Sequence, residues 1–497
     1  MRKARLMVLA LTVLAIPKNL VAQAGTSSVA YSTANFGATT IETTGGSASL
    51  VVGYAKAQPV ASTTPTGFAI LGLRENGVLV TETAVPGMTA ITSGRTFAEV
   101  NGPINTGLAI MNPSSAPVVV SFNFTDQAGN DFGQNSFTLA ANAHIARFLS
   151  EAPFGLRSGF IGTLTFNSPA PIAVTAVRTL VNERSDFLMT AQPVLTLPGD
   201  ISVGPVLLAH FADGGGWRTE VILINTTDSM IAGTVEFFGQ GTPTVAATPL
   251  TLTVNGLSAA SFSYTLRPRA STTFETSGPA AGAIQTGSVH ITPTGGTTAP
   301  SAFALLSLFS NGATSTQATV QTQAAATALR SYVEVNSIGP VPGAIQTAIA
   351  IANDSATAAT VNLELRGLDG SSTGLTSSVI VPAFGHIANF VHELFPSLTV
   401  SAAGPFRGLL RITSFSSIAV LAARARYNEN GSFLITTTPV SNEASSASAA
   451  EVAFPQIVDG GGYATQFVLF SGITDQNTTG NLSFFGQDGQ PLNLTVR

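Results

Sequence analysis

The sequence predicts an all-β protein: tandem β-sandwich modules, immunoglobulin-like or jelly-roll-like, in an alternating array of two module types. Three observations support this fold class: composition, short alternating segments and long internal repeats. Hydrophobic residues make up 44% of the 497 residues and charged residues 9%, which is the balance of a folding chain rather than a disordered one. The many Thr, Val and Phe residues favour strands, because β-branched and aromatic side chains suit a pleated, half-buried surface.

Several short segments alternate apolar and polar side chains, for example Val120–Phe124, Val235–Phe237 and Val361–Leu365. A period of two is typical of a strand with one face in a core and the other in water. Turn clusters rich in Gly and Asp follow these segments, which indicates hairpins. The segment His386–Leu394 is the best candidate for a short helical turn, or for a strand with a loop.

Internal repeats give the organisation of the chain. Residues 105–194 recur as residues 346–440, which we name module one. A second unit, module two, begins with Asp213-Gly-Gly-Gly-Trp217-Arg-Thr and recurs from Asp459-Gly-Gly-Gly-Tyr463-Ala-Thr. The opening strands of both modules match in outline, so we expect all copies to share one fold.

The predicted organisation is as follows: a signal peptide (1–24), a partial β module that resembles the back half of module two (25–92), module one (93–197), module two (201–325), a second module one (328–441) and the front half of module two (450–497). Two explanations of the incomplete ends are open. One is a truncated reading frame with a degenerate first unit. The other is pairing of one chain's C-terminal half-module with the next chain's N-terminal half-module, which would build a fibre.

The first residues predict export. Arg2, Lys3 and Arg5 precede the apolar run 6–16, which is too short to span a bilayer, and Ala22-Gln23-Ala24 is a small-residue cleavage site. We therefore expect a secreted or cell-surface protein, cleaved after Ala24 by the Sec route. No later stretch is long and apolar enough to predict a transmembrane helix.

Charge limits the classes of binding partner that we expect, and the cysteine content limits how the modules can be stabilised. Loss of Arg2, Lys3, Arg5 and Lys18 takes the formal charge from −5 to −9 (−5 − 4) and leaves one lysine, Lys56. Without a basic stripe, nucleic acid and anionic membrane surfaces are not expected partners. Cysteine is absent, so disulfides cannot stabilise the modules.

Trp217 and Tyr463 occupy matching positions after the glycines. An exposed ring there could form a sugar-binding platform; alternatively the ring packs over the end of the sandwich, which we favour. Asp213 and Asp459 could contact a ligand, although capping of a turn through an Asx hydrogen bond is the favoured role.

A set of polar residues recurs between the two copies of module one. It could form a repeated site in which Arg grips a carboxylate or sugar, but we favour structural ion pairs and strand-end hydrogen bonds. The matching pairs are Arg178 and Arg424, Glu151 and Glu393, Glu183 and Glu429, Glu99 and Glu334, and His144 and His386.

No catalytic residue, metal site or cofactor is predicted. Gly370-Ser-Ser372-Thr-Gly374 fits a nucleophile-elbow string but lies in an expected hairpin turn. His386 and His392 lack zinc-ligand spacing. Calcium would suit the turn carboxylates, which form no complete loop motif: Asp126, Asp131, Asp354 and Asp369.

The repeated Asp-Gly-Gly-Gly-Trp/Tyr-x-Thr motif occurs together with Ser93–Pro103, Asn105–Ile110 and Phe148–Phe154. This combination resembles repeat modules of large, uncharacterised proteins secreted by acidobacterial soil bacteria, and it covers nearly the whole mature chain. The resemblance implies an exported β-sandwich array and carries no activity, ligand or site.

We therefore expect a non-enzymatic extracellular structural or adhesive protein, with self-association or a surface polysaccharide as its partner. The alternative is a secreted glycan-binding protein that uses Trp217 and Tyr463. A third hypothesis, a hydrolase with Glu151 and Glu183 as catalytic carboxylates, is disfavoured.

Overall fold

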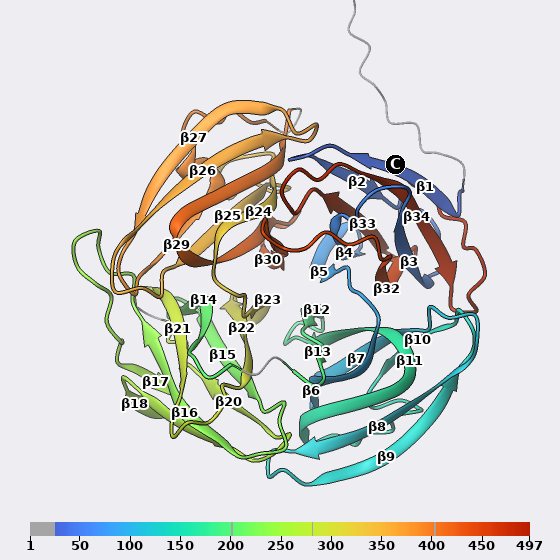
Figure 1. Cartoon of the computed structure of the whole chain (residues 1–497), viewed down its shortest axis with the longest axis horizontal. Coiled ribbons are helices and arrows are strands. Elements are labelled where there is room, and N and C mark those ends of the chain that lie inside the picture. Colours follow the sequence, from blue (N-terminus) through green and yellow to red (C-terminus); the bar gives the residue numbers. More distant parts are fainter. Residues whose placement is uncertain (1–24, 200–201, 281, 402–403) are drawn as a thin grey trace, which may run out of the picture.

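A computed structural model of the chain describes residues 25–199, 202–280, 282–401 and 404–497; the expected signal peptide lies outside the described residues. The chain is built from antiparallel strands, and the described part contains one short helix. The expected all-β sandwich fold is thereby confirmed. Four sandwich modules surround a common centre, as Figure 1 shows, and we name them A to D around the ring.

Module C shows the shared architecture most plainly. Its two four-stranded sheets have the orders β14-β21-β16-β19 and β20-β15-β22-β23. A small hairpin, β17 and β18, connects β16 to β19. The strands are β14 (Val206–Asp213), β15 (Trp217–Ile224), β16 (Ile231–Phe238), β17 (Leu252–Val254), β18 (Leu257–Ala259), β19 (Phe262–Leu266), β20 (Ser271–Glu275), β21 (Gln285–Pro293), β22 (Ser301–Ser310) and β23 (Ala313–Gln321).

Modules B and D keep this order but fuse two strands into one. The first half of a 22-residue strand pairs in one sheet and its second half in the other. Module B comprises β6 (Ile91–Asn101), β7 (Ile104–Met111), β8 (Val118–Asp126), β9 (Asp131–Leu139), β10 (His144–Phe148), β11 (Phe160–Val181), β12 (Phe187–Gln192) and β13 (Leu195–Thr196).

Module D has the matching elements in the same order. They are β24 (Ala326–Val335), β25 (Ile345–Ala352), β26 (Ala359–Gly367), β27 (Ser372–Val381), β28 (His386–Phe390), α1 (Val391–Leu394), β29 (Phe406–Tyr427), β30 (Phe433–Thr438) and β31 (Val440–Asn442). The helical turn expected near His386–Leu394 is therefore a strand followed by a four-residue helix. The Gly370–Gly374 string lies at the β26–β27 hairpin, as expected.

Module A corrects the predicted organisation. Residues 25–92 and 450–497 are not two separate half-modules, because they pair with each other into the sheets β1-β34-β3-β32 and β2-β33-β4-β5. In Figure 1 the blue and red ends of the chain interleave there. The strands are β1 (Ser28–Thr33), β2 (Ala38–Glu42), β3 (Val51–Pro59), β4 (Thr66–Glu75), β5 (Val78–Pro86), β32 (Val452–Asp459), β33 (Tyr463–Phe470) and β34 (Thr478–Gly486).

The two ends meet side by side. The Thr26 amide donates to the Leu494 carbonyl (2.9 Å), and the Leu494 amide donates to the Thr26 carbonyl (3.0 Å). The core of module A mixes both ends as well, for example Tyr31 with Phe467 and Phe484. Module A is thus a circularly permuted copy of module C, and pairing within one chain completes it without a second chain.

The centre of the ring is made of four edge strands, β5, β12, β23 and β30, one from each module (Figure 1). An edge strand has unpaired backbone groups that need partners. Here threonine hydroxyls of the neighbouring module supply them. Thr81 accepts from the Met189 amide (3.1 Å), and Thr316 accepts from the Ile435 amide (3.0 Å) at the matching place across the ring.

Candidate functional site

The two Asp-Gly-Gly-Gly segments form tight turns that join β14 to β15 and β32 to β33. All three glycines of each turn have positive φ, a conformation that side chains disfavour. A Cβ on Gly216 would lie 2.2 Å from the Phe309 carbonyl oxygen, and one on Gly462 would lie 2.4 Å from that of Arg74. Only glycine fits this approach, and the turn places the aromatic residue at the start of the following strand.

Asp213 and Asp459 stabilise these turns in a different way from the Asx capping that we expected. The Asp213 carboxylate accepts from the Gly278 amide (2.8 Å), and Asp459 accepts from the Gly45 amide (2.9 Å). Both side chains are buried. Each bond joins the turn to a loop distant in sequence rather than to its own backbone, so these carboxylates fix the ends of the sandwich.

Trp217 lies at the interface between modules C and D. Its half-buried ring packs against the core of module C and meets Phe433 of module D edge to face, with ring centroids 6.1 Å apart at 80°. The Trp217 ring is thus packed at the end of the sandwich, which is the alternative that we favoured over an exposed sugar-binding platform. Trp217 therefore links two modules.

Tyr463 lies at the matching interface between modules A and B, but its surroundings are open. It lines a cleft of about 340 Å³. Burial raises the pKa of its phenol. The other lining side chains include Leu108, Phe148, Phe187, Met189 and Val458, with Arg147, Glu151, Gln456 and Gln487 supplying polar groups. The sequence pointed to Tyr463 and Glu151 but gave no sign that they share a cleft.

The recurring arginines lie buried at module interfaces. Arg178 pairs with Glu99 (3.3 Å) and donates to Gln317 of module C (2.7 Å). At the matching place Arg424 pairs with Glu334 of its own module and with Glu82 of module A (3.4 Å). The arginines thus hold neighbouring modules together.

Charge and burial set the pKa values of these groups. Burial alone would raise the pKa of Glu334, but the guanidiniums of Arg424 and Arg407 outweigh it and lower that pKa. Glu334 is therefore ionised at neutral pH. Glu220 of module C differs: burial raises its pKa to about 7, with only partial compensation by Arg178.

The recurring glutamates bond to backbone amides. Glu183 accepts from the Thr314 amide across the B–C interface, and Glu429 accepts from the Leu79 amide across the D–A interface, both at 2.8 Å. Glu151 accepts from the Phe148 amide at 2.9 Å. Its counterpart Glu393 accepts from the Phe390 amide at 2.7 Å, at the start of α1. Glu151 and Glu183 thus serve separate loops, and no hydrogen bond joins them in the described structure.

The recurring histidines lie at the remaining pair of interfaces. His386 Nε2 lies 3.0 Å from Nδ1 of His210 in module C, and His144 lies beside Tyr54 of module A, with ring centroids 6.0 Å apart. Burial lowers the pKa of His144 and of His210 to about 4, and it lowers that of His386 as well. All three are neutral at neutral pH. His210 carried no sequence signal, because its counterpart in module A is Gln456.

The carboxylates considered for calcium have other partners. Asp131 pairs with Arg269 (2.9 Å), Asp126 accepts from Asn130 and Asp354 lies 3.2 Å from His290. Asp369 accepts from Ser371. In the residues that the structure describes, no group of three or more His, Cys, Asp or Glu side chains is arranged to hold a metal ion.

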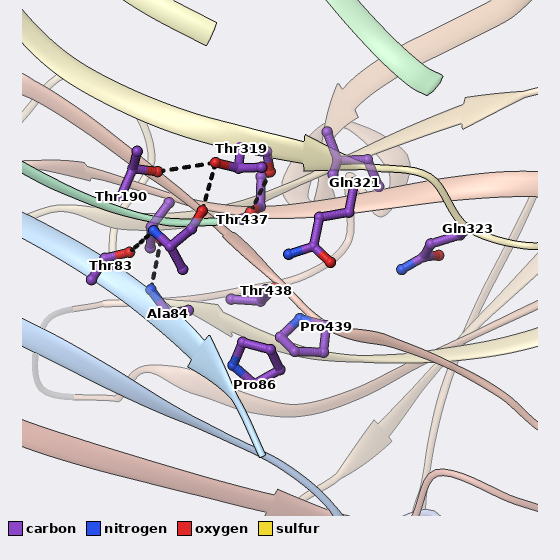
Figure 2. Close-up of a pocket in the computed structure, with 13 residues that line it drawn as sticks. Thr83, Ala84, Pro86, Thr190, Thr319, Gln321, Gln323, Thr437, Thr438 and Pro439 are labelled. Atoms are coloured by element: carbon purple, nitrogen blue, oxygen red, sulfur yellow. Dashed lines mark hydrogen bonds between the residues drawn. The ribbon is translucent and has the colours of Figure 1, made fainter. Parts of the chain in front are cut away.

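A small cavity of about 100 Å³ lies where the central strands meet (Figure 2). Thr83, Thr190, Thr319 and Thr437 bond around it. Thr319 donates to the Ala191 carbonyl (2.6 Å), Thr437 donates to the Thr319 carbonyl (2.7 Å) and Thr83 accepts from the Ala191 amide (2.8 Å). Gln321 and Gln323 line the same cavity. These threonine bonds connect all four modules, so we assign the cavity to the assembly of the ring.

In the described residues no helix has the length and apolar character needed to cross a membrane. No family model matches the chain, and no curated protein matches it.

Several solved structures show weak similarity. The Thermotoga maritima 1070 structure is 13% identical, with a TM-score of 0.19 over 23% of this chain and 100% of that one. The Anabaena sensory rhodopsin transducer is 13% identical, with a TM-score of 0.16 over 17% of this chain and 94% of that one. An archaeal-virus triple jelly roll is 12% identical, with a TM-score of 0.14 over 72% of this chain and 90% of that one. These values define no shared fold.

Proposed function

We propose that the protein is an exported, non-catalytic structural or adhesive protein whose working unit is the closed four-module ring. The observation that carries the proposal is the pairing of β1–β4 with β32–β34. A ring closed by sheet hydrogen bonds holds its modules at fixed positions. It therefore suits a rigid platform better than the extended spacer that a linear array of such modules would form.

The outer surface fits contact with polar surfaces. Strands β9 and β27 lie on the outside of modules B and D (Figure 1), and most of their residues are exposed. They contain Ser, Thr, Asn and Gln but few charges. Such a surface offers hydrogen bonds over a broad area without the charge that would select nucleic acid.

Export is tested by expressing residues 1–497 with a C-terminal tag and fractionating the cells. The expected result is recovery outside the cytoplasm of a chain that begins at Gly25. A matched control replaces Arg2, Lys3 and Arg5 by Gln, which should slow export. Retention of the wild-type chain in the cytoplasm would contradict the proposal.

Adhesion is tested by coating beads with the purified ring and measuring their retention on polysaccharide and mineral surfaces under flow. A chain that ends at residue 450 lacks three strands of module A and should lose the retention. The same protein should hydrolyse no member of a glycan and peptide panel. Turnover that disappears in Glu151→Gln or Glu183→Gln would favour the hydrolase hypothesis instead.

A further inference from the structure

The cleft beside Tyr463, between modules A and B, has the size of a small-molecule site. We name it the Tyr463 cleft and define it by Tyr463, Phe148, Phe187, Gln456 and Gln487. Its volume of about 340 Å³ falls at the lower end of the range of about 300–1,000 Å³ that is usual for ligand pockets. Three aromatic rings from two modules line it.

At the matching interface, between modules C and D, an aromatic ring of the chain itself occupies the corresponding space. Tyr463 pairs with Leu73 across the sheet, and Trp217 pairs with Leu308 in the same way, so the two residues are structural counterparts. In the C–D interface the indole of Trp217 lies against Phe433, the counterpart of Phe187. The chain itself thus places a flat ring beside this phenylalanine.

Two further differences enlarge the open space at the interface between modules A and B. Gly107 takes the place of Ala348, and a Cβ on Gly107 would lie 3.4 Å from the Phe148 ring. Gln456 takes the place of His210, which in the C–D interface stacks on His386 with ring centroids 5.1 Å apart. The missing methyl group at Gly107, the absence of a second imidazole at position 456 and a phenol in place of the indole leave the Tyr463 cleft open for an external ring.

The polar groups of the cleft indicate the kind of ring. The half-buried Gln456 lines the cleft, and its side chain lies close to the buried His144 of module B. Arg147 is exposed; it donates to the Ala146 carbonyl (2.9 Å) and has no ion-pair partner in the described part of the chain. With Glu151 and Gln487 the cleft offers both donors and acceptors, and its one cation and one anion cancel. Such a set suits a neutral ligand with several hydroxyl groups.

We propose that the Tyr463 cleft binds one sugar ring of a neutral glycan, at one site per chain. The apolar face of the ring lies against Tyr463, Phe148 and Phe187, and its hydroxyl groups bond to Gln456, Gln487, Arg147 and Glu151. This inference rests on the proposed adhesive function and gives it a ligand class. The Trp217 side of the ring does not bind, because the indole already fills the corresponding space.

The test uses the mature chain and named probes. Saturation-transfer NMR and calorimetry are run with the methyl glycosides of glucose, galactose, mannose and N-acetylglucosamine, and with β-1,4-linked disaccharides of glucose and N-acetylglucosamine. Indole serves as an apolar ring without hydroxyl groups. At least one saccharide should bind with a stoichiometry of one per chain. Binding of indole with no saccharide bound, or binding of neither, overturns the sugar assignment.

The variants copy the C–D interface into the cleft. Gly107→Ala with Tyr463→Trp should weaken saccharide binding at least tenfold and leave the urea midpoint within error of wild type, because both residues fit the counterpart interface. Unchanged binding in this variant overturns the site.

Glu151→Gln and Glu393→Gln form a matched pair, since each carboxylate accepts one local backbone amide. Only the first should weaken binding; an equal loss in both would mean that the effect is structural and would overturn the role of Glu151. Bead retention with no saccharide binding would remove the cleft as a site and leave the adhesive function standing. Absence of bead retention with saccharide binding intact would overturn the adhesive function and leave the Tyr463 cleft standing as a sugar site.

Discussion

Replacement of Arg424 by Met should destabilise the ring where modules D and A meet. The Arg424 guanidinium is 7% exposed and bonds to Glu334 and Glu82, which are 3% and 8% exposed. Breaking a buried ion pair by removing one partner costs about 3–5 kcal/mol, because a charge is left buried without its partner. Arg407 still pairs with Glu334 and Arg426 with Glu82, so we expect a loss near the lower end of this range.

The assay is urea unfolding followed by tryptophan fluorescence and by circular dichroism. A loss of about 3 kcal/mol corresponds to more than a hundredfold change in the folded-to-unfolded ratio. The triple variant Arg424→Met, Glu82→Gln, Glu334→Gln should be less stable than the single variant, because it also takes the carboxylate partners away from Arg426 and Arg407. Arg218→Met, which breaks an exposed pair with Glu275, is the control and should cost less than about 1 kcal/mol. A loss below about 1 kcal/mol for Arg424→Met, or a triple variant as stable as the wild type, refutes the reasoning.

Three further predictions follow from buried groups. The pKa of His210 is about 4 in the folded ring and about 6.5 unfolded. The unfolded chain therefore binds more protons between these values, and stability is retained above pH 6.5 and falls as the pH drops toward 4, by about 3 kcal/mol at most from this group. Urea titrations at several pH values should show a shallower fall in His210→Gln; an unchanged slope contradicts the assignment. Thr316→Val removes the hydroxyl that bonds the β30 backbone and should cost about 1–3 kcal/mol in thermal unfolding, with Thr316→Ser recovering most of it; equal losses argue against the hydroxyl. Gly216→Ala should cost several kcal/mol more than Gly312→Ala in urea, because both have positive φ but only the first places a Cβ against a backbone oxygen; similar losses would show that conformation alone matters.

The sequence was sufficient to predict the class of fold, because its signals are local. Alternation in Val235–Phe237 and similar segments follows directly from the pleat of a strand. The Asp-Gly-Gly-Gly turns could be located, and the glycines are indeed required by positive φ. The partner of Asp213 could not be predicted, since its carboxylate bonds to Gly278, 65 residues away, and no local pattern encodes that distance.

Closure of the ring and the cleft were beyond sequence reasoning for the same reason. The repeats located the two parts of module A, yet nothing in either part states whether its partner lies in the same chain or the next. The cleft depends on differences between two similar interfaces: Tyr463 against Trp217, and Gly107 against Ala348. Such differences have meaning only once the interfaces are known. Phe148, Phe187 and Gln456 therefore gave no signal as site residues.

The split module determines the order in which this chain can mature. Ser28 and Ser483, which are bonded across β1 and β34, lie 455 residues apart. The N-terminal strands β1–β5 emerge hundreds of residues before β32–β34, so they wait with unpaired edges and an uncovered apolar face. Modules B, C and D are contiguous and can form in the meantime, whereas such long-range pairing is intrinsically slow. The last three strands therefore act as the final step of assembly, and a chaperone that shields β1–β5 until then would protect the chain from aggregation.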